Sequence, residues 1–311
     1  MNALKWSGLA MAMVAWGAGA QAETLEVPPP VGSPSAEMVV QPAAAPVLVP
    51  VIPWALRLPK TDQVTFHGVS SLDRAGGDAG AMVYPGLGVA GFLAAIVTHG
   101  VIMESVKSAE LTKLQKQADQ VLAPYQDILQ SFHHRELMQK GLDQASMGEP
   151  RQLIDAASED RPGWVIDSMP VFTMTQDRRA IVLENLLRIR KPDAAPGEFY
   201  QNTVRVVSPA RQAADLQALW GADQGVLLKD ESVRLFAQSL RLGVADAGRS
   251  KTEAKAHKTV RYSEGGVEKM ERGEVIEDRC GRVVVRTLRG WVMSVPARGA
   301  SAAAPDAGQC G

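Results

Sequence analysis

The sequence predicts an α+β fold, in which a long N-terminal helical segment packs on a mainly antiparallel β-sheet and a helical insertion separates two groups of strands. Helical periodicity runs from Pro85 to about residue 145, and strand-like apolar runs recur between residues 162 and 296. The predicted divisions of the chain are a signal peptide (1–22), a Pro/Ala-rich extended arm or linker (23–80), a helical segment (81–160), an α+β domain (161–297) and a flexible tail (298–311).

The first residues have the pattern of a secretory signal. Lys5 precedes an apolar stretch of signal length, and Ala20-Gln21-Ala22 is a small-residue cleavage site. We therefore expect cleavage between Ala22 and Glu23 and export to the periplasm or an equivalent space. The alternative is an N-terminal membrane anchor, but the apolar stretch is short for a span. After the signal, repeated prolines disfavour helix, so residues 23–80 are expected to be extended.

The segment 81–103 is nearly uncharged and contains Gly86, Gly88 and Gly91 in G-x-G-x-x-G spacing. A dinucleotide site needs a preceding strand and a following strand that ends in an acid, and neither pattern occurs here, so no cofactor is expected. The segment is also long enough to cross a bilayer. Two interpretations stay open: a buried or membrane-peripheral helix, which we favour, and a span that would place the protein in the inner membrane.

Apolar or small residues then recur in alternating steps of three and four, at Leu111, Leu114, Ala118, Val121, Tyr125, Ile128 and Phe132. Pro124 lies inside this pattern, so we expect one helix to end near Ala123 and another to begin with Pro124 in its first turn. The stripe predicts packing against the chain's own sheet. The alternative is helix-mediated self-association.

Three strand-like runs follow, of which the first two predict a hairpin: 164–175, 179–190 and 198–208. Residues 210–220 and 230–243 are expected to be helical, with Asp230 as the cap of the second helix. Four further runs predict strands in the final third: 258–263, 267–278, 282–288 and 291–296. A four-residue loop over 278–281 would place Glu277 opposite Arg282.

Composition limits the classes of partner. The 311 residues carry a net charge of −1, and no basic run is interleaved with aromatic residues, so nucleic acid is not an expected partner. The two cysteines, Cys280 and Cys310, are candidates for a disulfide, and the alternative is two unrelated thiols. A membrane span at 81–103 would return the C-terminal part to the cytoplasm, so the span and the disulfide are close to mutually exclusive.

The sequence contains no short catalytic or metal-binding motif. The histidines form neither H-x-x-x-H nor H-E-x-x-H, no C-x-x-C occurs, and G-x-S-x-G and the P-loop are absent. We therefore expect no metal and name no catalytic residue.

The predicted function is a non-catalytic binding or structural role in the cell envelope, with an envelope protein or a cell-wall component as partner. Trp291, Arg286 and Arg289 are the candidate contact residues, because Trp and Arg are over-represented among interface anchors. Trp291 filling the core is the alternative. Two other functions stay open: a membrane-tethered protein anchored by residues 81–103, and a secreted hydrolase whose site is assembled from scattered residues.

Overall fold

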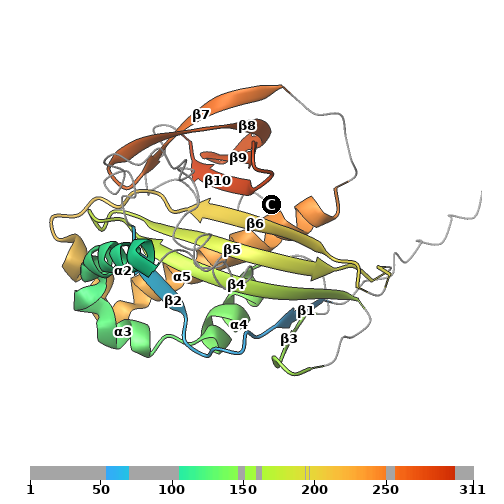
Figure 1. Ribbon diagram of the computed structural model, residues 1–311, viewed down its shortest axis with the longest axis horizontal. Helices are drawn as coiled ribbons and strands as arrows, with labels where there is room; N and C mark the ends of the chain where they lie inside the picture. Colours follow the sequence, from blue (N-terminus) through green and yellow to red (C-terminus); the bar gives the residue numbers. More distant parts are fainter. Residues whose placement is uncertain are drawn as a thin grey trace, which may run out of the picture. The chain divides into compact units, whose positions relative to one another are not determined.

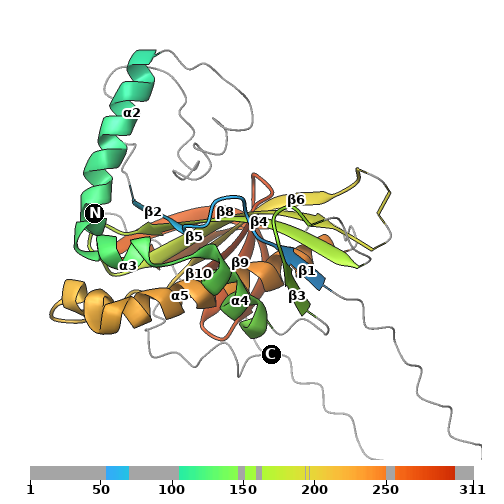
Figure 2. The same cartoon turned by 90° about the horizontal axis from the view of Figure 1, so that it is seen from below.

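The computed structural model describes residues 54–69, 105–145, 151–158, 163–192, 194–195, 197–249 and 256–297. They form a sheet of ten strands, with α3, α4 and α5 on the same side of it (Figures 1 and 2). The strands are β1 (Trp54–Arg57), β2 (Thr65–Gly68), β3 (Arg151–Ile154), β4 (Trp164–Met174), β5 (Ile181–Arg190), β6 (Tyr200–Val207), β7 (His257–Glu264), β8 (Val267–Arg279), β9 (Arg282–Thr287) and β10 (Val292–Pro296). The helices are α2 (Ser105–Ala118), the 3-10 helix η2 (Asp119–Tyr125), α3 (Gln126–Gln130), α4 (His134–Gln144) and α5 (Leu216–Ala247).

The sheet is mixed. Its strand order is β3-β1-β4-β5-β6-β10-β9-β8-β7, and β2 pairs with β4. The pairs β1–β3, β1–β4, β2–β4 and β6–β10 are parallel, whereas β4–β5–β6 and β7–β8–β9–β10 are antiparallel. The predicted hairpin of 164–175 with 179–190 is confirmed as β4–β5. Two strands, β1 and β2, come from the range that the sequence predicts to be an extended arm.

The predicted fold class is wrong, because the described residues contain no long N-terminal helix and the sheet is mixed, with four parallel strand pairs beside its five antiparallel ones. Residues 105–145 are divided into α2, η2, α3 and α4. Pro124 has no amide to donate and lies inside the 3-10 helix, Tyr125 leaves helical geometry (φ −113°, ψ 9°), and His133 is extended (φ −105°, ψ 149°). The long helix is α5, which comes later in the chain.

The periodic stripe of this region packs inside the protein. Val121, Tyr125 and Phe132 are buried in the main hydrophobic core, and Ile128 packs against that core half-buried. Phe66 of β2 stacks on Phe172 of β4 with ring centroids 4.9 Å apart. These residues therefore reach the core from η2, α3 and the segment before α4, without one continuous helix.

The core lies between α5 and the sheet. Along β5, alternate side chains point to opposite faces, so Leu183, Asn185 and Leu187 face α5. We call this side of the sheet the helix face. Inside it, the Asn185 side-chain amide donates to Ser239 Oγ at 2.9 Å, which satisfies a buried polar group between apolar neighbours.

The helix α5 differs from the two predicted helices in the residue that caps its N-terminus and in the position at which its helical geometry is interrupted. Its N-cap is Asp215, whose carboxylate accepts the amide of Ala218 at 2.9 Å, whereas the predicted cap Asp230 lies inside the helix. Residues 222–225 leave helical geometry and divide the helix. Gly225 is left-handed there (φ 76°), and a Cβ at this position would lie 2.4 Å from Ile128 Cγ2.

The predicted register of the β8–β9 hairpin is also wrong. The loop contains two residues, Cys280 (φ 54°) and Gly281 (φ 68°), and both are left-handed, as a type I′ turn requires. This two-residue turn pairs Arg279 with Arg282 and therefore places Glu277 opposite Val284. A register shift between Val275 and Glu277 then places Val275 opposite Val285.

Several predictions lie outside the described residues: signal cleavage between Ala22 and Glu23, the segment 81–103, and Cys310 with its disulfide to Cys280. Within the described ranges, no helix combines the length and the apolar character that crossing a bilayer requires.

Candidate ligand-binding site

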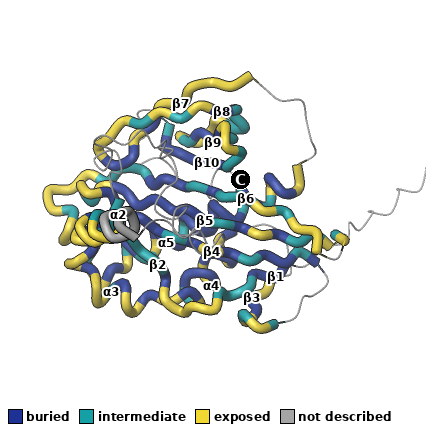
Figure 3. The backbone as a smooth tube through the Cα atoms, viewed as in Figure 1, coloured by how far each residue is buried: buried dark blue, intermediate teal, exposed yellow. Residues whose placement is uncertain are grey.

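The face of the sheet opposite α5 is accessible over its central strands, and we call it the second face. Met169 of β4, Leu186 of β5 and Thr203 of β6 are direct cross-strand partners on it. Met169 is 53% exposed, and Leu186 and Thr203 are half-buried. In Figure 1, α5 lies behind these strands, so the second face is turned toward the viewer. The burial map in Figure 3 turns from dark blue to teal and yellow toward the β5–β6 connection.

A row of charged residues crosses this face next to Met169. Register places Arg57 of β1 beside Asp167 of β4, and Asp167 opposite Arg188 of β5. Arg57 Nη1 donates to Asp167 Oδ1 at 2.9 Å. Asp167 is therefore flanked by two guanidinium groups and paired with one of them.

A pocket of about 200 Å³ opens at the end of this row. Its polar lining consists of the Arg57, Asp167 and Arg188 row together with Arg190 and Glu198, and Val165, Gly197 and Phe199 complete the wall. Among the described residues, the lining carries three guanidinium groups and two carboxylates. An excess of positive charge in a small concave site favours an anionic group.

Phe199 and Arg188 stack against each other in the wall of the pocket. The Arg188 Cζ lies 3.5 Å from the centroid of the Phe199 ring, and the ring itself is 41% exposed. Stacking covers one face of the guanidinium and leaves its in-plane N–H groups available to an acceptor. The loop before Phe199 turns at Gly197 (φ 84°), a backbone conformation that suits glycine.

An ion network holds the β7–β8 hairpin on the other end of the second face. Arg205 of β6 pairs with the buried carboxylates of Glu184 and Glu264, and Lys269 Nζ lies 2.5 Å from Glu264 Oε1. Burial alone would raise the pKa of Glu264, but the charges of Arg205 and Lys269 outweigh it and hold that pKa below its usual range. The hairpin turn is fixed as well, because the Gly266 amide donates to Asp177 Oδ2 at 2.6 Å.

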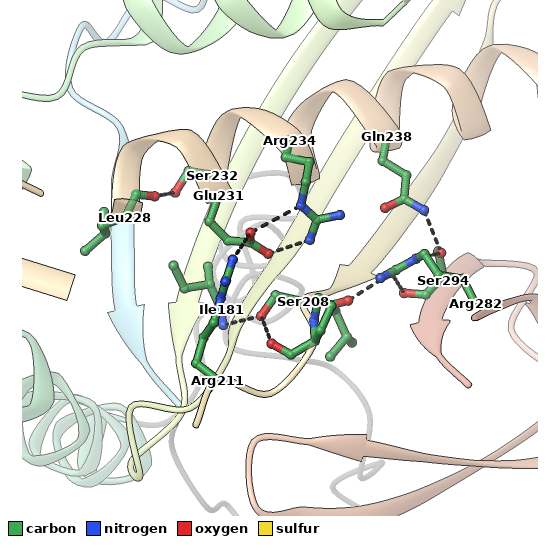
Figure 4. Close-up of polar contacts among 12 residues, drawn as sticks. Ile181, Ser208, Arg211, Leu228, Glu231, Ser232, Arg234, Gln238, Arg282 and Ser294 are labelled. Carbon is green, nitrogen blue, oxygen red and sulfur yellow. Dashed lines mark hydrogen bonds and ion pairs between the residues drawn. The ribbon is translucent and has the colours of Figure 1, made fainter. Parts of the chain in front are cut away.

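A second polar cluster lies under α5 on the helix face (Figure 4). Glu231 is buried and accepts from Arg211 at 3.0 Å and from Arg234 at 3.2 Å. The two arginines lower the pKa of Glu231 although burial would raise it. Arg282 donates to Ser294 Oγ and to the Val207 carbonyl, at 3.0 and 2.9 Å. These groups join α5 to the strand ends, and the cluster is therefore structural.

The three predicted contact residues are not equivalent. Arg286 donates to the buried Asp246 of α5, which also accepts from the Tyr200 hydroxyl, so the half-buried guanidinium of Arg286 is held by an interior carboxylate. Arg289 is exposed, and its Cζ lies 5.8 Å from the centroid of the half-buried Trp291 ring. Of the predicted patch, Arg289 and Trp291 are together at the surface, and their contact role stays a prediction.

The histidines are dispersed. His134 is buried at the start of α4, its Nδ1 lies 2.9 Å from the Thr61 carbonyl, and burial lowers its pKa. His133 Nδ1 lies 3.0 Å from Asp62 Oδ2 at the surface. Over the described ranges, no three His, Cys, Asp or Glu side chains are grouped as metal ligands.

The pocket is not among the sites that the sequence predicts. The run "LLRIR" at 186–190 did contain a signal, because arginines two residues apart in a strand point to the same face. Arg57 and Asp167 gave no comparable signal, since they are 110 positions apart in the chain. Their proximity depends on the parallel pairing of β1 with β4.

Comparison with known proteins gives no family. No protein-family model, no curated protein and no solved structure matches this chain. The geometry of the pocket and of the second face therefore carries the functional proposal.

Proposed function

We propose that this protein is exported to the cell envelope and has a non-catalytic binding role there, with the second face of the sheet as its binding surface. One observation carries the proposal: the middle of that face is accessible and ends in a pocket of mixed charge, whereas the helix face is filled by α5 and the core. Sheets commonly bury both faces, or bury one and expose polar residues on the other. An accessible face that carries apolar side chains is therefore a candidate binding surface.

The composition of the accessible area supports a binding role. It joins an apolar part, Met169 with half-buried Leu186 and Val171, to a charged part around Arg188. Methionine and arginine are enriched at protein interfaces, and apolar area beside fixed charges provides both affinity and orientation. The partner we propose is an envelope protein, a peptide or a cell-wall component.

Two measurements in cells test the proposal. Mass spectrometry of the mature protein should find an N-terminus at Glu23, and fractionation should find the protein in the periplasm. A photo-crosslinking amino acid at position 169 should capture an envelope component, and capture should be lost when Arg188→Glu is added.

The matched control places the same amino acid at Gln139, an exposed position on α4. We expect no common product from positions 139 and 169. A mature chain that retains Met1, or identical crosslinked products from the two positions, would contradict the proposed function.

A further inference from the structure

We propose that the pocket at the end of the second face binds a terminal carboxylate, carried by a small organic acid or by the C-terminus of a peptide, with Arg188 as the residue that pairs with it. The inference names the ligand chemistry of the proposed binding role and rests on it.

Arg188 is prepared for such a contact. Its guanidinium is stacked on Phe199 at 3.5 Å, and among the described residues it has no ion pair or side-chain hydrogen bond. Stacking restricts the side chain before a ligand arrives, so less conformational entropy is lost on binding. The free in-plane N–H pair has the geometry of a bidentate contact with a carboxylate.

The nearest carboxylate across the strands does not neutralise Arg188. Asp167 is its direct cross-strand partner, but the Oδ1 atom of Asp167 accepts from Arg57 at 2.9 Å. The other carboxylate of the pocket, Glu198, accepts the Ala195 amide at 3.2 Å within its own loop. Both acids are therefore engaged, and the charge of Arg188 is available to a ligand.

The same two acids decide the class of anion. The guanidinium of Arg188 offers one positive charge, which matches one negative charge, and a phosphate monoester with nearly two charges would meet repulsion from Asp167 and Glu198. A carboxylate carries one charge and is planar, like the guanidinium edge. The ligand class that fits is therefore a monocarboxylate.

The size of the pocket indicates that it holds one end of a ligand. Its volume of about 200 Å³ is below the range typical of sites that enclose a whole drug-sized molecule. Val165 and Phe199 provide an apolar wall beside the arginines, which suits a small side chain or methyl group next to the carboxylate. The remainder of a longer ligand would lie toward Met169.

Calorimetry on the purified protein tests the inference with three probes. N-acetyl-alanyl-alanine carries a free terminal carboxylate, its C-terminal amide is the neutral control, and acetate is the smallest carboxylate. We expect the free acid to bind at least about tenfold more tightly than the amide, because a charge-assisted contact is lost in the amide. Acetate that binds as well as the dipeptide would identify small acids as the source of the carboxylate. Tighter binding of the dipeptide would identify peptide termini.

Variants assign the contact to Arg188. Arg188→Gln should weaken binding of the free acid about 10- to 100-fold, and Phe199→Leu should weaken it less, because the wall remains and only the stacking is removed. The matched control is Arg261→Gln, an exposed arginine on β7 that pairs with Glu268. Arg188 is exposed, so its variant should keep the wild-type melting temperature.

Three results would overturn the inference: no binding of either carboxylate, equal affinity for acid and amide, or unchanged affinity in Arg188→Gln. These results concern the purified protein alone. A failure of export would appear only in the cell fractionation, so the two proposals fail separately.

Discussion

Arg205 is the residue on which the ion network of the second face depends, because it neutralises the two buried carboxylates of Glu184 and Glu264. We predict that Arg205→Met lowers the free energy of unfolding by about 3–5 kcal/mol, since uncompensated charge would stay buried. Lys269→Met removes the outer, 40% exposed partner of Glu264 and should cost about 1 kcal/mol or less. Urea unfolding measures both values. Equal losses would show that Arg205 is not the centre of the network.

Arg286 and Arg289 are close in sequence but differ in what they contact. Arg286→Gln would leave the carboxylate of Asp246, which is 4% exposed, without its ion pair, so we predict a loss of about 2–4 kcal/mol. Arg289→Gln changes an exposed side chain and should alter stability by less than about 0.5 kcal/mol. Thermal melts of both variants provide the comparison. A stable Arg286→Gln protein would return Arg286 to the list of candidate contact residues.

At the scale of elements, α4 and α5 pack closely through Gly141. A Cβ at Gly141 would lie 2.4 Å from Cδ1 of Phe236, a ring that is fully buried and cannot move aside freely. We predict that Gly141→Ala lowers the free energy of unfolding by about 1–3 kcal/mol. Gly221→Ala is the matched control, because the added Cβ meets only Tyr125 Cε1 at 3.9 Å. That variant should be neutral or slightly stabilising in the same urea assay.

Local chemistry explains which elements could be predicted from the sequence. The apolar runs of β4 and β5 and the short polar connection between them are visible in the local sequence, and the hairpin was predicted from them. The break in α5 is not visible there, because left-handed Asp223 and Gln224 are held by tertiary packing that includes the fit of Gly225 against Ile128. The length of the β8–β9 loop was predicted wrongly because a cysteine gives little indication that it will adopt a positive φ.

At the scale of the whole molecule, the parallel strand pairs could not be predicted because they depend on contacts between segments that are far apart in the sequence. Trp54–Arg57 is a four-residue segment between prolines, and nothing local indicates that it pairs with both β3 and β4. The pocket depends on that pairing, since it brings Arg57 to Asp167. A site built by long-range register is visible in a sequence only where one strand supplies several of its residues, as β5 does with Arg188 and Arg190.

The last prediction concerns the stability of the whole protein in acid. Neighbouring arginines, together with Lys269 in the case of Glu264, hold the pKa of Glu231 and Glu264 below the 4.5 of an unperturbed glutamate, and burial lowers the pKa of His134 below 6.5. A group whose pKa is lower in the folded state stabilises the fold above its unfolded pKa, and this contribution is lost as the pH falls through the folded value.

We therefore expect the free energy of unfolding to be flat near pH 7, to begin to fall below about pH 6.5 as the unfolded state protonates His134, and to fall more steeply below about pH 4.5. Each proton taken up on unfolding contributes a slope of about 1.4 kcal/mol per pH unit. Urea titrations at about four evenly spaced pH values between pH 7.5 and pH 3.5 measure the free energy of unfolding as a function of pH. Glu264→Gln should reduce the steep acid part, whereas Glu268→Gln, at an exposed position on β8, should leave it unchanged. Stability that stayed constant down to the lowest pH would mean that neither buried carboxylate is held ionised by its arginines.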